Sequence, residues 1–463
     1  MLFYELDNEV IRCQVVFPKR ANNERFSIIL SSWYIVVHIN ITEEQFFYDS
    51  HGFVLKIPFY FGGMFNFSLI YKKKEIGSGK INIPYQIKQN HSSSIMCYGN
   101  EDNNRYCKMS NICFNGKTIV ILTNYSISLP KVFIPTGSHD ESDHPNEAII
   151  YNSCVSTSRN ISFNSDYQKI ESNAIVGSRY FNNQMLWHNV VDCLIPVFVT
   201  AKTNNLSFSN TKILLYDNFG KYGLYYLKML SSIDIISKKS KICVRECIVG
   251  LQKYPRFFNS ISKIQFNYTI NPETVVGLRE YILNHSVIAP DPKRPKIVIV
   301  SRKDLSSRVI INKQQLFESI KFHYPSARVH LLELETMDKL SQAKFISDAS
   351  VLIGIHGSGL THVLWMSPSS AESPTALLEI LPYKYTCRNW YEMLAKAAKV
   401  KYFPIHTTSI NNSTWKNTTN TQKINKCFAS EQECLNPKCH DFLRDQSVTI
   451  SISTIIRVLS GIL

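Results

Sequence analysis

The 463-residue sequence has no Cys-x-x-Cys pair, no repeat of solenoid length and few acidic side chains. Without that cysteine spacing a structural zinc ribbon is not expected, and the missing period excludes a repeat protein. Asp and Glu number 36 against 51 Lys and Arg, a formal net charge of +15. This excess favours an anionic partner such as phosphate, a nucleotide, an acidic glycan or a membrane surface, without choosing among them. The 44% of hydrophobic residues excludes wholesale disorder.

Cysteines and glycosylation sequons together indicate an oxidising, lumenal compartment. Eight of the twelve cysteines fall in close groups, which favour disulfides. Sequons of the form Asn-x-Ser/Thr begin at eleven positions, where this composition gives roughly six by chance, although compositional bias is the alternative. We predict the lumen of the endoplasmic reticulum or Golgi, for a membrane-anchored or secreted protein without a nucleic-acid partner. The close cysteines are Cys97, Cys107, Cys113, Cys243, Cys247, Cys427, Cys434 and Cys439.

The apolar run 26–41 has two interpretations. It follows three basic residues, Lys19, Arg20 and Arg25, as a signal anchor would. It is shorter than the ~20 residues of a spanning helix and contains polar side chains, which favours a buried β-strand. A membrane anchor is therefore an open expectation for this run.

The chain changes character along its length. Residues 1–150 alternate short apolar stretches with Gly, Asn and Ser, which predicts a β-rich region. From residue 173 strands alternate with helices, which predicts parallel sheets in two Rossmann-like lobes that face a cleft, at 151–284 and 285–425, before a Cys-containing tail and closing helix at 426–463. The predicted strands are 174–177, 212–216, 242–249, 296–300, 328–334, 351–355, 376–381 and 400–405. The predicted helices are 184–201, 223–230, 314–322, 337–347, 360–366, 390–399 and 448–459.

The sharpest motif lies where the strand 351–355 meets the following helix. Its residues are His356, Gly357, Ser358, Gly359, Leu360 and Thr361. Glycines let a backbone approach a ligand, and the free amides of a helix start attract anions, so a diphosphate is the natural occupant. The alternative is a tight turn whose glycines serve packing only.

A second motif follows the strand 296–300 and contains Ser301, Arg302, Arg308 and Asn312. Carboxyl ends of parallel strands meet at one sheet edge, so Arg302 and Arg308 are expected to converge on the glycine turn. Arginine binds phosphate through two donors and stays charged, which suits a nucleotide-sugar diphosphate held without a metal. A solvated basic surface is the alternative for these residues.

Two further positions carry ionisable groups in apolar segments. His188 and Asp192 are four residues apart on a predicted helix, so either could remove a proton from an acceptor hydroxyl, unless they are a surface pair or a core histidine. Glu379 lies inside a buried strand and should meet arginine, ribose hydroxyls or backbone amides, with a structural ion pair as the alternative.

Taken in order, these segments resemble glycosyltransferase family 61, whose members include O-GlcNAc transferases and plant xylosyl- and arabinosyltransferases. The resemblance covers roughly residues 173–460. It rests on His356-Gly357-Ser358-Gly359-Leu360-Thr361-His362, on Ser301-Arg302 with Arg308 to Asn312, on His188 and Asp192 before Leu194-Ile195-Pro196, and on Cys243 to Cys247.

The resemblance implies a GT-B architecture, a UDP-sugar donor, an inverting mechanism and no obligatory metal or other cofactor. We therefore expect a lumenal enzyme that moves GlcNAc or xylose from UDP to a hydroxyl of a glycoprotein or glycan. In it His188 or Asp192 is the base, and Ser301, Arg302, Arg308, Asn312, residues 356–361 and Glu379 bind the donor. The alternative is a non-catalytic lumenal glycan-binding protein of the same fold.

Overall fold

The structure is a computed structural model in which the chain divides into two compact units. Unit 1 comprises Met1–Phe181, Val199–Lys221 and Ser231–Lys253, and unit 2 comprises Asn182–Phe198, Tyr222–Leu230 and Tyr254–Leu463. Two helical segments of the first α/β run, within Asn182–Phe198 and Tyr222–Leu230, belong to unit 2. The described residues are 2–7, 10–15, 26–31, 36–41, 46–47, 52–56, 60–71, 73–83, 93–98, 106–116, 118–121, 127–128, 132–134, 149–151, 167–177, 185–215, 224–237, 239–251, 256–257, 267–268, 270–284, 288–302, 307–415, 426–430, 433–434 and 436–463.

Unit 1 is rich in β-strands, as the sequence predicts. In its largest sheet β4, β3 and β7 pair antiparallel, β7 and β9 pair in parallel, and β9, β10 and β18 pair antiparallel. The sheet continues from β18 through β15, β16 and β17, which pair in parallel. The strands are β1 (Leu2–Asp7), β2 (Val10–Val15), β3 (Phe26–Ser31), β4 (Val36–Ile41), β5 (Phe46–Phe47), β6 (Gly52–Lys56), β7 (Tyr60–Tyr71), β8 (Lys74–Ile83), β9 (Ser94–Tyr98), β10 (Tyr106–Asn115), β11 (Thr118–Ile121), β12 (Ile127–Ser128), β13 (Val132–Ile134), β14 (Ile149–Tyr151), β15 (Gln168–Gly177), β16 (Thr211–Leu215), β17 (Ile233–Ile235) and β18 (Lys241–Val249).

Two segments of the run 26–41 form strands. β3 (26–31) and β4 (36–41) pair antiparallel, which agrees with the β interpretation of these residues. Across the described part of the chain, every helix is too short or too polar to cross a bilayer.

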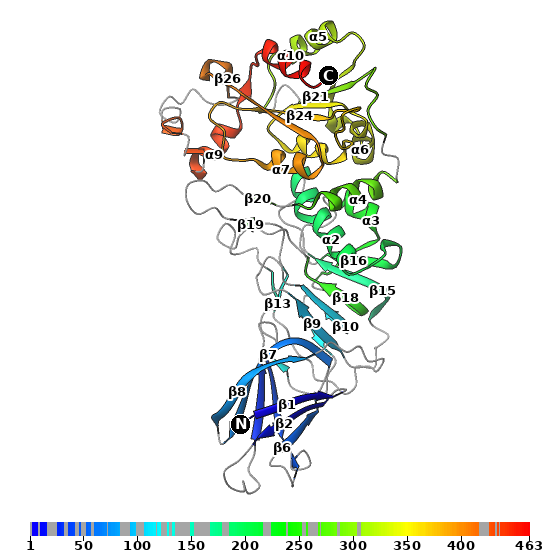
Figure 1. Cartoon of the computed structure of the whole chain (residues 1–463), viewed down its shortest axis with the longest axis vertical. Helices are drawn as coiled ribbons and strands as arrows, with labels where there is room; N and C mark the ends of the chain where they lie inside the picture. Colours follow the sequence, from blue (N-terminus) through cyan, green and yellow to red (C-terminus); the bar gives the residue numbers. More distant parts are fainter. Residues whose placement is uncertain are drawn as a thin grey trace. The chain divides into compact units, whose positions relative to one another are not determined.

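Unit 2 is built on a five-stranded parallel sheet with the order β22-β21-β23-β24-β25 (Figure 1). Strand order reverses between β21 and β23, and ligands of such sheets bind at the carboxyl ends of the two strands that flank this reversal. The strands are β21 (Lys296–Ser301), β22 (Arg328–Glu333), β23 (Val351–Ile355), β24 (Ala376–Leu381), β25 (Lys401–His406) and the short β19 (Arg256–Phe257), β20 (Asn267–Tyr268), β26 (Ser413–Thr414) and β27 (Ser447–Val448).

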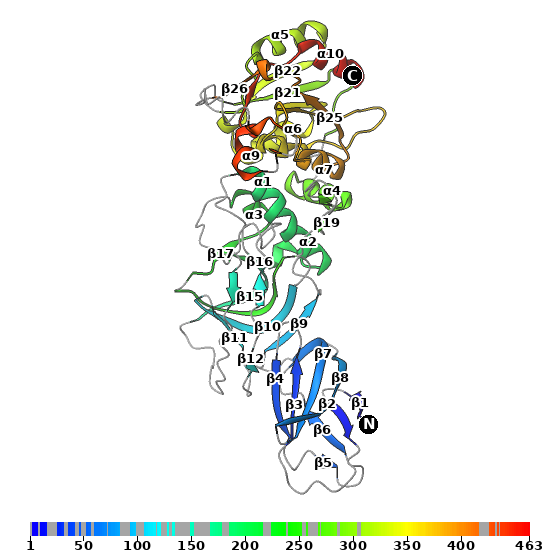
Figure 2. The same cartoon turned by 90° about the vertical axis from the view of Figure 1, so that its left-hand side faces the viewer.

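Helices cover both faces of this sheet, as Figures 1 and 2 show from two directions. One face packs on α5 and α10 in a cluster that includes Leu378 and Ile380 of β24, while the opposite face meets α6, η5 and α7. Side chains alternate along a strand, so Glu379 projects to that opposite face. The helical segments are α1 (Leu186–Asn189), η2 (Val190–Leu194), α2 (Ile195–Thr203), η3 (Phe208–Asn210), α3 (Tyr225–Leu230), α4 (Pro272–Ile282), α5 (Lys313–His323), η4 (Leu334–Thr336), α6 (Lys339–Ser347), η5 (Ser358–Trp365), α7 (Trp390–Ala397), η6 (Ile410–Asn412), α9 (Pro437–Arg444) and α10 (Ile452–Ser460).

The predicted strands and helices of unit 2 are confirmed within a few residues, with three differences. The helix predicted from residue 360 is a 3₁₀ helix, η5. Just after its end, Nη1 of buried Arg279 donates a hydrogen bond to the carbonyl of Met366. The helix predicted over 184–201 is interrupted by the π-helical η2. The helices α4 and α9 lie in segments that we predict as polar or as tail. Asn271 and Asn436 cap them, and each cap is followed by proline, which is a start signal readable in the sequence.

Three disulfides confirm the interpretation for part of the cysteines, whereas Cys247 of the predicted groups is a buried free thiol. Cys113 pairs with Cys243 in unit 1. In unit 2, Cys387 pairs with Cys434 and Cys427 pairs with Cys439. Cys387–Cys434 fastens the segment before α9 to the loop that follows β24, and Cys427–Cys439 joins α9 to the chain just before it. No group of acidic, histidine and cysteine side chains that could hold a metal ion is found among the residues that the structure describes.

His362 of η5 gives unit 2 a predicted sensitivity to acid. Its Nε2 lies 3.0 Å from Oε1 of Gln342, and its Nδ1 is buried without a hydrogen bond among the described residues. Burial, with a smaller contribution from Lys339, lowers the pKa of His362 to about 3. The unfolded chain keeps the ordinary histidine pKa of about 6.5, so it binds more protons than the folded chain as the pH falls.

We therefore expect the free energy of unfolding to drop by about 2 kcal/mol between pH 7.5 and pH 5 because of this residue alone. Urea unfolding at several pH values measures this. His362→Gln, which keeps a donor toward Gln342, should be less stable at neutral pH and should lose that part of the acid dependence. An unchanged slope in the variant would contradict the assignment.

Candidate functional site

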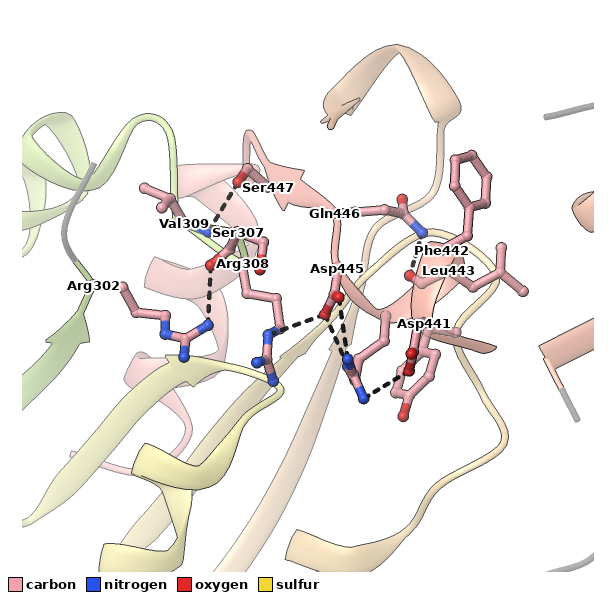
Figure 3. A network of polar contacts seen from close by, with 12 residues as sticks. Arg302, Ser307, Arg308, Val309, Asp441, Phe442, Leu443, Asp445, Gln446 and Ser447 are labelled. Carbon is pink, nitrogen blue, oxygen red and sulfur yellow. Dashed lines mark hydrogen bonds and ion pairs between the residues drawn. The ribbon is translucent and has the colours of Figure 1, made fainter. Parts of the chain in front are cut away.

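The strand-order reversal of unit 2 brings the predicted arginines and the glycine turn to the same edge of the sheet. Arg302 directly follows β21, and His356 directly follows the neighbouring strand β23. Nη1 of Arg302 donates to the carbonyl of Ser307 at 3.0 Å, which orders the return of the chain towards Arg308 (Figure 3). The predicted convergence of these two strand ends is what a parallel sheet imposes.

Arg308 lies directly against the glycine turn. A Cβ atom placed on Gly357 would be 3.3 Å from Nη1 of Arg308, so the guanidinium occupies the space that this glycine leaves. The backbone of Arg308 has a φ of 60°, a left-handed conformation that few non-glycine residues adopt. On its other side, Nε lies 3.4 Å from Oδ1 of Asp445 (Figure 3). Burial, and then the neighbouring cations Arg302 and Arg444, lower the pKa of Arg308.

The turn itself offers a short series of backbone donors. His356 N–H donates to the carbonyl of Ile380 and Leu360 N–H to that of Gly357, both at 2.9 Å. The N–H groups of Gly357, Ser358 and Gly359 make no hydrogen bond within the described residues, and no side chain caps η5. Close packing explains Gly359, whose Cβ would be 3.1 Å from Val300. These three amides at a helix start can bind an anion.

His356 and Glu379 form a buried pair behind the turn. Nδ1 of His356 lies 2.5 Å from Oε1 of Glu379, and the Tyr402 hydroxyl donates to Oε2 at 2.7 Å. The imidazole and the carboxylate are almost fully buried, and the rings of Tyr385 and Tyr391 pack edge-on against His356. A carboxylate on Nδ1 fixes the ring and leaves Nε2 as the nitrogen that can contact a ligand. Burial is the main cause that raises the pKa of Tyr402, and Glu379 adds to it.

The segment with the predicted base packs on the same part of unit 2. Trp187 of α1 stacks on Trp390 at the start of α7, with 5.0 Å between ring centroids, and Trp390 lies 6.5 Å from the His356 ring. The next residue, His188, is 7% exposed. Asp192 has its backbone in η2, and its side chain lies outside the described residues. π-helical turns are frequent at functional sites, which fits a site here.

The arrangement as a whole concentrates positive charge. The guanidinium groups of Arg302 and Arg444 both lie close enough to Arg308 to lower its pKa. Asp441 and Asp445 pair with Arg444, and Asp445 is shared with Arg308. Two acidic groups for three arginines, beside unbonded amides, favour an anionic ligand.

Comparison with protein families shows what the site-bearing part of the chain is similar to. The sequence model "Glycosyltransferase 61" matches residues 186–371, the part of the chain that holds His188, Arg302, Arg308 and the glycine turn. Residues 186–371 thus match glycosyltransferase family 61.

The curated relatives of this family 61 segment are distant. Alpha-1,3-arabinosyltransferase XAT2 of Oryza sativa subsp. japonica is 26% identical over 238 residues, 47% of this chain and 37% of its own length. The EGF domain-specific O-linked N-acetylglucosamine transferase of Canis lupus familiaris is 25% identical over 204 residues, covering 39% and 36%. Xylan glycosyltransferase MUCI21 of Arabidopsis thaliana is 26% identical over 245 residues, covering 47% and 46%.

The chain thus spans between about a third and a half of the length of these relatives. A solved structure, the metal-soaked Flv1 flavodiiron core from Synechocystis sp. PCC6803, aligns over 75% of this chain and 99% of its own with a TM-score of 0.18 and 8% identity. This value is too low to inform the fold.

Several residues predicted for donor binding in the family 61 segment have other contacts. The side-chain amide of Asn312 donates to the carbonyl of Ile450 at 2.9 Å and accepts from the N–H of Ile450 at 3.0 Å. These two hydrogen bonds hold the C-terminal segment in place. The side chains of Leu360 and Thr361 are fully buried, and the amides of His356 and Leu360 are already bonded. Glu379 pairs with His356 and accepts a hydrogen bond from Tyr402, and its role in donor binding stays a prediction.

Sequence reasoning missed the residues that complete the site from the C-terminal tail. Asp445 pairs with Arg308 of the family 61 segment, Arg444 pairs with Asp441 and Asp445, and Tyr385 contacts His356. The sequence feature that points to them is the group of cysteines at 387, 427, 434 and 439, which indicates that disulfides hold the tail. The local sequence does not indicate which part of the fold the tail contacts.

Proposed function

We propose that this protein is an inverting glycosyltransferase that uses a UDP-sugar, with the diphosphate held at the carboxyl edge of β21 and β23. One observation supports this most strongly: the buried Arg308 guanidinium lies 3.3 Å from the Cβ position of Gly357, where three backbone amides have no partner among the described residues. Arginine and backbone N–H groups are the usual ligands of phosphate oxygens. The match of residues 186–371 to the family 61 model supports this function.

In this proposal the chain's own cations assist the departure of UDP. Negative charge grows on the diphosphate as the glycosidic bond breaks, and donors already in place stabilise it more in the transition state than in the ground state. Arg302 and Arg308 supply the charge, with the amides of residues 357–359 beside them. Ser301 completes the strand end, and His356, fixed by Glu379, presents Nε2 to the donor.

His188 or Asp192 is proposed as the base that takes the proton of the acceptor hydroxyl. An inverting reaction needs the base on the face of the sugar opposite the leaving diphosphate, so its segment must approach from another direction than the glycine turn. Assays of His188→Ala and Asp192→Ala, made separately, distinguish the two residues. The packing of Trp187 on Trp390 places this segment in unit 2 together with the donor residues.

The acceptor and the sugar are proposed from the relatives. One is a transferase of EGF domains and two are named for arabinosyl or xylan glycosyl transfer, so we propose a protein or glycan hydroxyl as acceptor and GlcNAc, xylose or arabinose as sugar. Disulfides suggest the secretory pathway, and the lumen of the endoplasmic reticulum or Golgi is the proposed site of action. A GT-B arrangement with two lobes around the donor is part of this proposal.

Titration calorimetry with UDP tests the proposal directly. We expect a 1:1 complex whose affinity falls as salt rises, because guanidinium–phosphate pairs carry much of the binding. ATP should bind at least tenfold more weakly. UDP-GlcNAc, UDP-xylose and UDP-arabinose are then screened for slow hydrolysis, which identifies the sugar. Absence of UDP binding by the folded protein would refute the donor site and favour the glycan-binding alternative.

A further inference from the structure

Asp445 is an acidic residue at the edge of a site proposed to bind an anion. It follows α9, and its side chain is 34% exposed. Oδ1 lies 3.4 Å from Nε of Arg308 and 2.8 Å from Nε of Arg444, and Oδ2 lies 3.1 Å from Nη2 of Arg444 (Figure 3). The carboxylate therefore faces the Nε side of Arg308, while Nη1 faces the Gly357 turn.

The backbone around Asp445 is fixed against the backbone around Arg308. The amide of Val448 donates to the carbonyl of Val309 at 2.9 Å, and Val309 N–H donates to Oγ of Ser447 at 3.1 Å. The amide of Ile311 donates to the carbonyl of Val448 at 2.8 Å. A segment joined to its neighbour by these bonds holds its side chains at fixed positions.

Covalent bonds add to this anchoring. The Cys427–Cys439 disulfide ends inside α9, only a few residues before Asp445, and Cys387–Cys434 connects the same segment to the loop after β24. The carboxylate is therefore a fixed point next to a long, otherwise adaptable arginine side chain. Ordering such a side chain in advance reduces the entropy lost on ligand binding.

We propose that Asp445 is a positioning residue, which holds Arg308 on its Nε side so that Nη1 points at the glycine turn and binds the diphosphate of the donor. This inference rests on the proposed function. The negative charge of Asp445 repels a diphosphate, so by charge alone its removal should strengthen UDP binding. If Asp445 positions Arg308, its removal should weaken UDP binding, and the two effects can therefore be told apart.

The test compares Asp445→Ala with Asp445→Asn, using UDP and uridine as calorimetric ligands. The alanine variant should bind UDP about tenfold more weakly, because the ion pair that positions the Arg308 guanidinium is lost, and it should bind uridine as the wild type does. The asparagine variant keeps an acceptor oxygen and loses the charge, so its UDP affinity should stay within about twofold of wild type or rise. Glu273→Gln, which breaks an exposed ion pair with Lys399, is the control that should change neither affinity.

Two outcomes would overturn the positioning role. One is UDP binding by the alanine variant that equals or exceeds that of wild type, and the other is an equal loss for UDP and uridine, which indicates structural damage. Asp445→Ser serves in the same comparison if the alanine variant does not fold. Wild-type protein that binds no UDP contradicts the proposed function instead, whereas UDP binding lost with Arg308→Ala but kept with Asp445→Ala contradicts only this inference.

Discussion

Replacing Arg308 with alanine is expected to lower kcat/KM for the sugar donor by about 100-fold, the usual cost of removing one strong donor from a developing anion. Arg308 is buried, its Nη1 faces the Gly357 turn, and the positive charges of nearby cations repel its own. An anionic ligand at the turn would offset this repulsion. Donor hydrolysis and acceptor transfer, measured over a range of donor concentrations, give kcat and KM separately.

The melting temperature of Arg308→Ala should change little, because desolvation and the neighbours Arg302 and Arg444 already disfavour this guanidinium. Arg302→Ala should lose donor use in the same assay. Gly357→Ala is the matched test that leaves the arginine in the chain. The φ of Gly357 is 164°, an extended backbone open to any residue, but its new Cβ would lie 3.3 Å from Nη1 and displace the guanidinium. A stable Arg308→Ala protein with full turnover would remove Arg308 from the donor site.

The parallel sheet of unit 2 could be predicted because its signals are local. Continuous apolar runs such as Val351–Ile355 belong to strands buried on both faces, and their alternation with helices implies parallel pairing. Parallel pairing brings all carboxyl ends to one edge. The approach of Arg308 to Gly357 therefore follows from strand placement, even though 49 residues separate them in sequence.

The partners of the ionisable groups could not be predicted, because they depend on long-range returns of the chain. Glu379 is visibly a carboxylate in an apolar strand, but its contact with Tyr402 arises from the register of β24 against β25. Asp445 reaches Arg308 only because the segment after α9 returns to lie beside Val309. No periodicity encodes such a return.

The helix with the proposed base shows a different limit. Periodicity places His188 and Asp192 on one α-helical face, four residues apart. The chain instead widens into the π-helical η2 at Val190, which changes the direction in which each following residue projects. An α-helix and a π-helix here would contain the same apolar residues, so composition does not distinguish them. The packing of Trp187 on Trp390 is a long-range contact that the sequence pattern does not predict.

Replacing Glu379 with alanine should lower the free energy of unfolding by about 3 kcal/mol and should also reduce turnover. The change leaves the His356 Nδ1 and the Tyr402 hydroxyl without their acceptor in a buried layer, and it removes the group that orients His356. Urea unfolding gives the stability, and donor hydrolysis at a temperature where the variant is folded gives the activity. Glu379→Gln keeps the shape and one acceptor oxygen, so it should recover much of both.

Tyr402→Phe separates the two effects of this cluster. It removes one hydrogen bond to Glu379 and leaves the His356–Glu379 pair intact, so we expect a loss of about 1 kcal/mol in stability with turnover nearly unchanged. If turnover depends on the orientation of His356, activity should fall in Glu379→Ala and not in Tyr402→Phe at matched folded fractions. Equal activity of both variants would mean that Glu379 supports the fold alone, and that His356 needs no carboxylate behind it to serve the donor.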